Sequence, residues 1–159
     1  MAGALAAAAA GALLGACAAK EEGAPARGEG ASYQSIPAPT RAGVATRITA
    51  SDDGKAALVA VGTTIQVELI GVPTAGYAWG VVEAPSFLKP AGETGGPTSE
   101  AQRQPGFAGG SHWEVFFFDV LEAGEGMLRL EQRRIWEEDE PANDTFSVLV
   151  KAEPAAAPE

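Results

Sequence analysis

The residues that most constrain the fold of this chain form a strand, a tight turn and a second strand in direct succession. Residues 64–70 alternate apolar and polar side chains with the two-residue period of a half-buried β-strand. Pro73 fixes its own φ, and Gly76 can take the positive φ that other residues avoid. Tyr77 and Trp79 then share one face of the next strand. Such a rigid tip suits insertion into another protein's cleft better than it suits catalysis.

Further short strands are expected along the rest of the chain, separated by turn signals at 51–54 and 123–126. The expected strands are 45–49, 56–61, 77–83, 87–88, 99–104, 113–121, 127–133 and 146–150. The Pro- and Gly-rich span 84–105 is otherwise expected to be loop, and no amphipathic helix of useful length is indicated. Short strands at this spacing are typical of an antiparallel β-sandwich.

The N-terminus has the composition of a targeting segment. Residues 1–16 are almost wholly Ala, Gly and Leu, and Leu14-Gly15-Ala16-Cys17 fits the bacterial lipobox. The sequence therefore predicts a lipoprotein signal peptide at 1–16 and lipidation of Cys17, with acyl chains such as palmitate anchoring the protein in a membrane. We expect it in the bacterial cell envelope, at the outer membrane where the cell has one. A plain secretory signal, giving a periplasmic or secreted protein, and an Ala-rich helix with a chance cysteine stay open, because no basic residue precedes the apolar core.

The remaining chain divides by composition. Residues 17–43 are rich in Ala, Gly, Pro, Ser and Glu without a helical or strand period, which predicts a flexible tether after the lipidated cysteine. Residues 44–152 are the expected folded domain, and 153–159 a short low-complexity tail. Cys17 is the only cysteine, so an intramolecular disulfide is excluded.

Charge and residue spacing exclude several classes of function. A formal net charge of −10 argues against a nucleic-acid partner. Cys17 precedes the tether and so cannot pair with His112, the single histidine. The sequence also has no Gly-x-Ser-x-Gly motif that would supply a serine nucleophile, so nucleophilic catalysis is not expected. No His/Cys cluster has zinc spacing, and the acidic run 137–140 is consecutive rather than spaced as in a calcium loop. We therefore expect neither an enzyme nor a bound metal or cofactor.

The body resembles the chagasin family of cysteine-peptidase inhibitors through three short motifs in the family's order. The family motifs are Asn-Pro-Thr-Thr-Gly-Tyr/Phe-x-Trp, Gly-x-Gly-Gly and Arg-Pro-Trp. The matching residues are Val72-Pro73-Thr74-Ala75-Gly76-Tyr77-Ala78-Trp79, Phe107-Ala108-Gly109-Gly110 and Arg134-Ile135-Trp136. The chain departs from the motifs at Val72, Ala75, Phe107 and Ile135. The first two changes remove polar groups from the first tip, and Ile135 loosens the φ restraint of the third.

The resemblance implies an all-β, immunoglobulin-like antiparallel sandwich with three binding loops at one end. It further implies a monomer that reversibly inhibits papain-like cysteine peptidases by wedging these loops into the active-site cleft. The expected peptidase-binding residues are Pro73, Thr74, Ala75, Gly76, Gly109, Gly110, Arg134 and Trp136.

Each of these residues also has a purely structural interpretation. Tyr77 and Trp79 are expected to pack inward as core. Trp136 and Arg134 could form a cation–π pair that holds their own loop, and the glycines at 109–110 could serve a turn alone. For the whole protein, the alternative function is a surface-anchored binding or assembly module that uses the same fold without inhibiting a peptidase.

Overall fold

The computed structural model describes residues 35–137 and 139–155. The expected signal peptide, Cys17 and most of the expected tether lie outside these residues. The described chain forms eight strands and three 3₁₀ turns, with no helix long and apolar enough to cross a membrane. The strands are β1 (Val44–Thr49), β2 (Ala56–Ala60), β3 (Thr64–Gly71), β4 (Tyr77–Glu83), β5 (Leu88–Pro97), β6 (His112–Val120), β7 (Gly124–Arg134) and β8 (Asp144–Glu153). The turns are η1 (Ala50–Asp52), η2 (Pro73–Ala75) and η3 (Glu100–Arg103).

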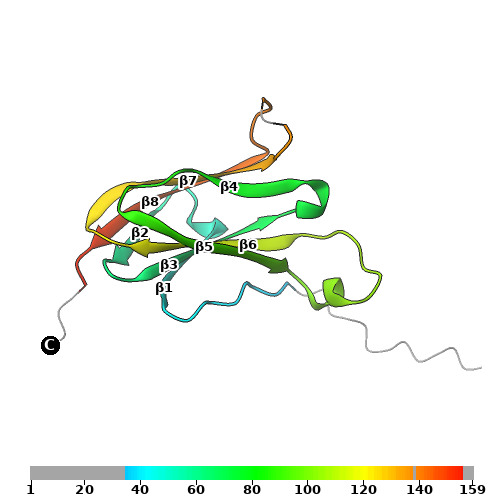
Figure 1. Cartoon of the computed structure of the whole chain (residues 1–159), viewed down its shortest axis with the longest axis horizontal. Coiled ribbons are helices and arrows are strands. Elements are labelled where there is room, and N and C mark those ends of the chain that lie inside the picture. The colour runs from blue at the N-terminus through cyan, green and yellow to red at the C-terminus, as the bar shows by residue number, and fades with distance from the viewer. Residues whose placement is uncertain (1–34, 138, 156–159) are drawn as a thin grey trace, which may run out of the picture. The chain divides into compact units, whose positions relative to one another are not determined.

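The strands form two four-stranded sheets that lie one above the other (Figure 1). The first sheet has the order β1-β3-β6-β5 and the second the order β2-β8-β7-β4. The all-β sandwich expected from the sequence is confirmed. The two edge pairs β1–β3 and β2–β8 are parallel, however, whereas an antiparallel arrangement was expected throughout. The chain passes from the first sheet to the second between β1 and β2, through η1. β1 therefore pairs with β3, and β2 pairs with β8, each in parallel.

The core between the sheets follows the alternation seen in the sequence. Ile65, Val67 and Leu69 of β3 point inward and meet Phe116 and Phe118 of β6. The second sheet supplies Leu128, Leu130, Phe146, Val148 and Val150. On the outer face of the first sheet, Trp113, Val115 and Phe117 form a second buried cluster with Ala38. This second cluster explains why residues 115–118 are all apolar and show no two-residue period.

The span 84–105 differs from the sequence expectation. A ten-residue strand, β5, runs through residues expected to be mostly loop, and residues 99–104, expected as a strand, contain η3 instead. β5 lies at the edge of the first sheet, where a proline is tolerated, and its register shifts between Pro90 and Gly92. Ser99 and Gln102 form a capping box that starts η3.

Residues 36–42, which we call the strap, lie against the outer face of the first sheet. Ala38 is buried there with the aromatic residues of β6. The sequence assigned these residues to the flexible tether, because their composition shows no regular period. The structure therefore extends the folded part to Ile36, and at the other end β8 continues to Glu153.

Candidate functional site

Three loops lie at one end of the sandwich, which we call the loop end. The first loop is residues 72–76, the second 98–111 and the third 135–143, of which residue 138 is not described. The strand register fixes this arrangement, because Gly71 pairs with His112 and Tyr77 pairs with Arg134. In Figure 1 the first and second loops lie at the right, and the third, in orange, projects above them.

The first loop is a tight 3₁₀ turn held by its own backbone. Pro73 opens the turn, and Gly76 ends it at a φ of 84°. The amide of Ala75 donates to the carbonyl of Val72 at 2.9 Å, and the amide of Gly76 donates to the carbonyl of Pro73 at 2.9 Å. Residues 73–75 are exposed, so a rigid tip projects into solvent.

Trp136 of the third loop packs on Gly76 of the first. A Cβ added at Gly76 would lie 1.9 Å from Cη2 of Trp136, so only glycine leaves room for the indole ring. The Trp136 residue is still 63% exposed. The contact therefore fixes one edge of the indole ring and leaves much of the side chain open to a partner.

Arg134 is held by neighbours at the loop end. Its guanidinium lies 4.6 Å from the centre of the Tyr77 ring, and its Nη1 donates to Oε1 of Glu137 at 2.9 Å. The hydrogen bond from Glu137 raises the pKa of Arg134, so the guanidinium stays charged. The cation–π interaction considered from the sequence exists, but its aromatic partner is Tyr77.

The second loop is organised by Gln102 of η3. Its Oε1 accepts the amide of Ser99 at 2.9 Å, and its Nε2 donates to the carbonyl of Ser111 at 2.7 Å. Gly109 and Gly110 both have positive φ, 84° and 92°. A Cβ at Gly110 would lie 2.3 Å from Nε2 of Gln102, whereas Gly109 has open space around it. Gly110 is thus required by its φ and by the contact with Gln102, and Gly109 by its φ alone.

Gln132 links the end of β3, just before the first loop, to the third loop, and sequence reasoning did not find it. Its Nε2 donates to the carbonyl of Ile70 at 3.3 Å, and its Oε1 accepts Nδ2 of Asn143 at 2.7 Å. The same Ile70 carbonyl accepts Nε1 of Trp79 at 2.9 Å. Trp79 is buried as expected, while Tyr77 is only half-buried. The signal in the sequence was its register in β7, where it follows the inward-facing Leu128 and Leu130 at the two-residue period.

Glu114 of β6 joins the two sheets beneath the loops. Its Oε2 accepts the amide of Trp79 at 2.8 Å, and its Oε1 has no hydrogen-bond partner among the described residues. Burial raises the pKa of Glu114, and the nearby charge of Glu93 raises it further. A Cβ at Gly71 would lie 1.9 Å from Oε1, so glycine is needed there for the carboxylate to fit.

The loop end offers shape and apolar surface rather than reactive groups. Within the described range, no cluster of three His, Cys, Asp or Glu residues could hold a metal ion. Its exposed large apolar side chains are Val72, Phe107, Ile135 and Trp136. Three of these stand where the sequence departs from the family motifs, so the departures make the surface more apolar. The structure thus brings all eight expected binding residues to one end, and Cys17 lies outside the described residues.

Comparisons with known proteins agree with this arrangement. Residues 58–150, more than half of the chain, match the family model described as Chagasin family peptidase inhibitor I42. The cysteine protease inhibitor EhICP2 from Entamoeba histolytica has a similar fold, with 18% identity, a TM-score of 0.58, and 68% of this chain and 95% of that chain covered. No curated protein matches the chain significantly.

Two further solved structures are similar over much of their length. The solution structure of amebosin has 25% identity and a TM-score of 0.48, with 68% of this chain and 97% of that chain covered. The structure of PbICP-C in complex with falcipain-2 has 16% identity and a TM-score of 0.44, with 76% and 99% covered.

Proposed function

The chain belongs to the chagasin family of peptidase inhibitors, and on this premise we propose that it blocks the active-site cleft of papain-like cysteine peptidases with its three loops. As a member of an inhibitor family it is not an enzyme. The observation that carries the proposal is the preformed loop end, in which Trp136 rests on Gly76. Because these loops are already ordered, binding avoids much of the entropic cost of fixing them.

The three loops supply different kinds of contact. Residues 73–75 form a narrow, rigid tip that can reach the floor of a cleft. Gly109 has no side chain and open space around it, so a peptidase can approach its backbone closely. Trp136 supplies a flat, exposed apolar surface of the kind that most often dominates binding energy at interfaces. Arg134 keeps the third loop in place through Tyr77 and Glu137.

Titration of papain with the chain from Ala18 onward tests the proposal. We expect reversible inhibition of papain and no inhibition of a serine peptidase, whose cleft differs in shape. A folded protein that leaves papain fully active at micromolar concentration would contradict the proposal and favour the binding-module alternative. The Trp136→Ala variant should raise the inhibition constant at least about tenfold. An unchanged constant would show that the third loop does not contribute.

The lipobox supports a membrane anchor as the second part of the proposal. Lipidation of Cys17 would hold the inhibitor, as a monomer, in the bacterial cell envelope, at the outer membrane where one exists. Labelling cells with a palmitate analogue tests this part, with the Cys17→Ser variant as the control. Label on the parent protein and none on the variant is expected. Equal labelling, or an unlabelled parent protein found in the soluble fraction, would contradict the anchor.

A further inference from the structure

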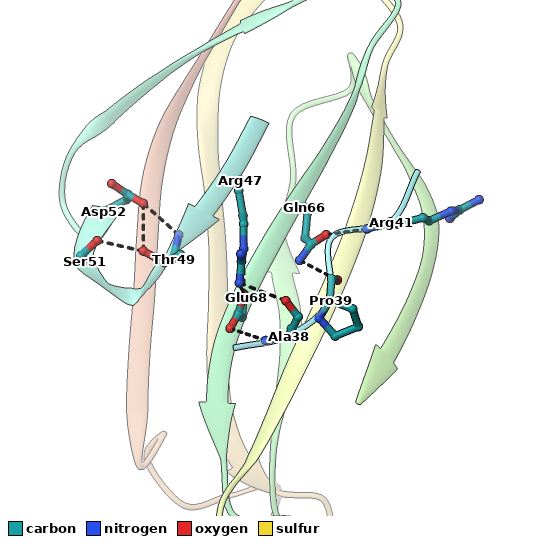
Figure 2. A network of polar contacts seen from close by, with 9 residues as sticks. All are labelled: Ala38, Pro39, Arg41, Arg47, Thr49, Ser51, Asp52, Gln66 and Glu68. Atoms are coloured by element: carbon teal, nitrogen blue, oxygen red, sulfur yellow. Dashed lines mark hydrogen bonds and ion pairs between the residues drawn. The ribbon is translucent and has the colours of Figure 1, made fainter. Parts of the chain in front are cut away.

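The outer face of β3 carries two polar side chains that are buried. Gln66 is 0% exposed and Glu68 is 8% exposed, although the alternation of β3 turns both away from the core. The strap covers them (Figure 2). Ala38 of the strap also packs on the aromatic residues of β6. Buried polar groups cost free energy unless they are hydrogen-bonded, so their partners decide whether the strap stays in place.

Glu68 is satisfied by the strap and by β1. Its Oε1 accepts the amide of Ala38 at 3.0 Å, and its Oε2 pairs with the guanidinium of Arg47. The same guanidinium donates to the carbonyl of Ala38 at 3.2 Å, so Ala38 is held on both its backbone groups (Figure 2). A charged partner makes these hydrogen bonds stronger than neutral ones.

Gln66 and Phe117 hold the following part of the strap. Nε2 of Gln66 donates to the carbonyl of Pro39, and its Oε1 accepts the amide of Arg41, both at 3.4 Å (Figure 2). The Arg41 guanidinium lies 5.1 Å from the centre of the Phe117 ring and donates to the carbonyl of Ala91 at 3.1 Å. The strap therefore bridges β3, β6 and β5.

The first residue of the strap is bonded to the second loop. The amide of Ile36 donates to the carbonyl of Thr98 at 2.6 Å. The Thr98 hydroxyl donates to the carbonyl of Ser111 at 3.0 Å and lies 3.2 Å from Oε1 of Gln102. Gln102 also donates to the carbonyl of Ser111. A continuous set of contacts thus runs from Glu68 along the strap to the second loop.

We propose that the strap is a positioning element for the second binding loop. It lies before the residues that match the family model. With the strap docked, the Thr98 carbonyl has an amide partner and the base of the second loop is fixed against the first sheet. With the strap released, the Thr98 carbonyl loses this partner, while the hydrogen bonds of Gln102 and of the Thr98 hydroxyl to Ser111 remain. The effect on peptidase binding rests on the proposed function; the coupling between strap and loop does not.

Two variants of the full chain release the strap in different ways. Glu68→Ala removes the carboxylate that binds Ala38. Ala38→Pro removes the donating amide and adds a ring at a buried position beside the β6 aromatic residues. Neither substitution touches the core between the sheets. Glu125→Ala, which breaks the exposed Glu125–Lys151 ion pair on the second sheet, is the matched control. Two readouts do not depend on inhibition of a cysteine peptidase, namely cleavage by trypsin after Arg41 and amide exchange across residues 98–111.

Both strap variants should be cleaved after Arg41 at least about fivefold faster than the control, and amides of the second loop should exchange roughly five- to tenfold faster. Amides of the first loop should be unchanged, because they donate to carbonyls of their own turn and have no contact with the strap. Dissociation from papain should accelerate about fivefold. Accelerated cleavage with unchanged exchange in 98–111 would overturn the coupling, as would cleavage that neither variant accelerates. Failure of the parent protein to inhibit papain would contradict the proposed function, while the exchange data would still decide the coupling.

Discussion

At the loop end, Gly76 cannot be replaced without a collision, because a side chain there would meet Trp136. Gly76 has a φ of 84°, and its Cα faces the indole of Trp136. Gly62 has the same φ of 84°, lies at the opposite end of the sandwich and has open space where a Cβ would be. Substitutions at Gly62 and Gly76 therefore separate two contributions to stability, the strain of the backbone conformation and the collision with Trp136.

The Gly76→Ala variant should lose more stability than the Gly62→Ala variant. Both pay roughly 1–2 kcal/mol for alanine in the left-handed region. Only the former must also displace Trp136, so it should in addition weaken inhibition of papain about tenfold or more. Urea denaturation and inhibition constants measure the two effects. Equal losses of stability with unaltered inhibition would show that Trp136 moves aside without consequence.

Glu114 gives the protein a pH dependence whose sign follows from its raised pKa. Between its ordinary pKa of 4.5 and the higher value in the folded protein, the folded state binds more protons than the unfolded state. The contribution of Glu114 to stability is therefore complete below the ordinary value and is lost as the pH rises through the folded-state value.

The Glu114→Gln variant should lack this pH dependence. Glutamine keeps an oxygen that can accept the Trp79 amide and carries no charge to desolvate. The parent protein should lose stability relative to the variant as the pH rises above the ordinary pKa of a glutamate, because the buried carboxylate then ionises. Urea midpoints across this rise in pH measure the difference. Glu93→Gln should reduce the slope in part, since Glu93 adds to the shift. Parallel profiles for parent and variant would contradict the assignment.

At the scale of elements, the turn η2 and strands β3 and β4 were predictable, because Pro73 and Gly76 set the turn and the alternation of 64–70 sets the strand. β5 was not predictable from its own residues. Its prolines and glycines indicate loop, and it forms a strand because β6 offers a long apolar edge to pair with. The hydrogen bonds of Gln132 and Gln102 were likewise hidden, since they depend on which carbonyls the fold brings near.

Gln132 couples the third loop to the end of β3, from which the first loop begins. The Gln132→Leu variant keeps the side-chain size but leaves Nδ2 of Asn143 without its partner, so stability should fall by about 1–3 kcal/mol. Amides of both loops should exchange faster together, while those of the second loop should not change. Glu131→Ala, the neighbouring position in β7 with a half-exposed ion pair, should cost at most about 1 kcal/mol. Faster exchange in only one of the two loops would refute the coupling.

At the scale of the whole molecule, composition predicted the sandwich but placed its N-terminal boundary too late. The strap carries no period, and its docking depends on Gln66 and Glu68, which a sequence reader assigns to solvent. The docked strap also fixes the direction from which the chain enters the domain. The strap runs from the second loop toward the start of β1, so the described chain begins at the loop end (Figure 1). With Cys17 lipidated, as we propose, the membrane attachment would reach the domain at the end that binds the peptidase.

This direction makes the length of the segment between Cys17 and the strap a determinant of inhibition at a membrane. A flexible linker of about 18 residues spans roughly 20–25 Å on average, and one of about 8 residues roughly 15 Å. A small domain is about 30 Å across, so the shorter linker should crowd a bound peptidase against the bilayer. Deleting residues 22–31 should therefore slow association with papain for the lipidated protein on vesicles, by about tenfold. The same deletion in the Cys17→Ser protein, measured in solution, should leave the rate unchanged, because no membrane is present to obstruct. Equal rates on vesicles with and without the deletion would show that the chain leaves the domain away from the membrane-facing side of the complex.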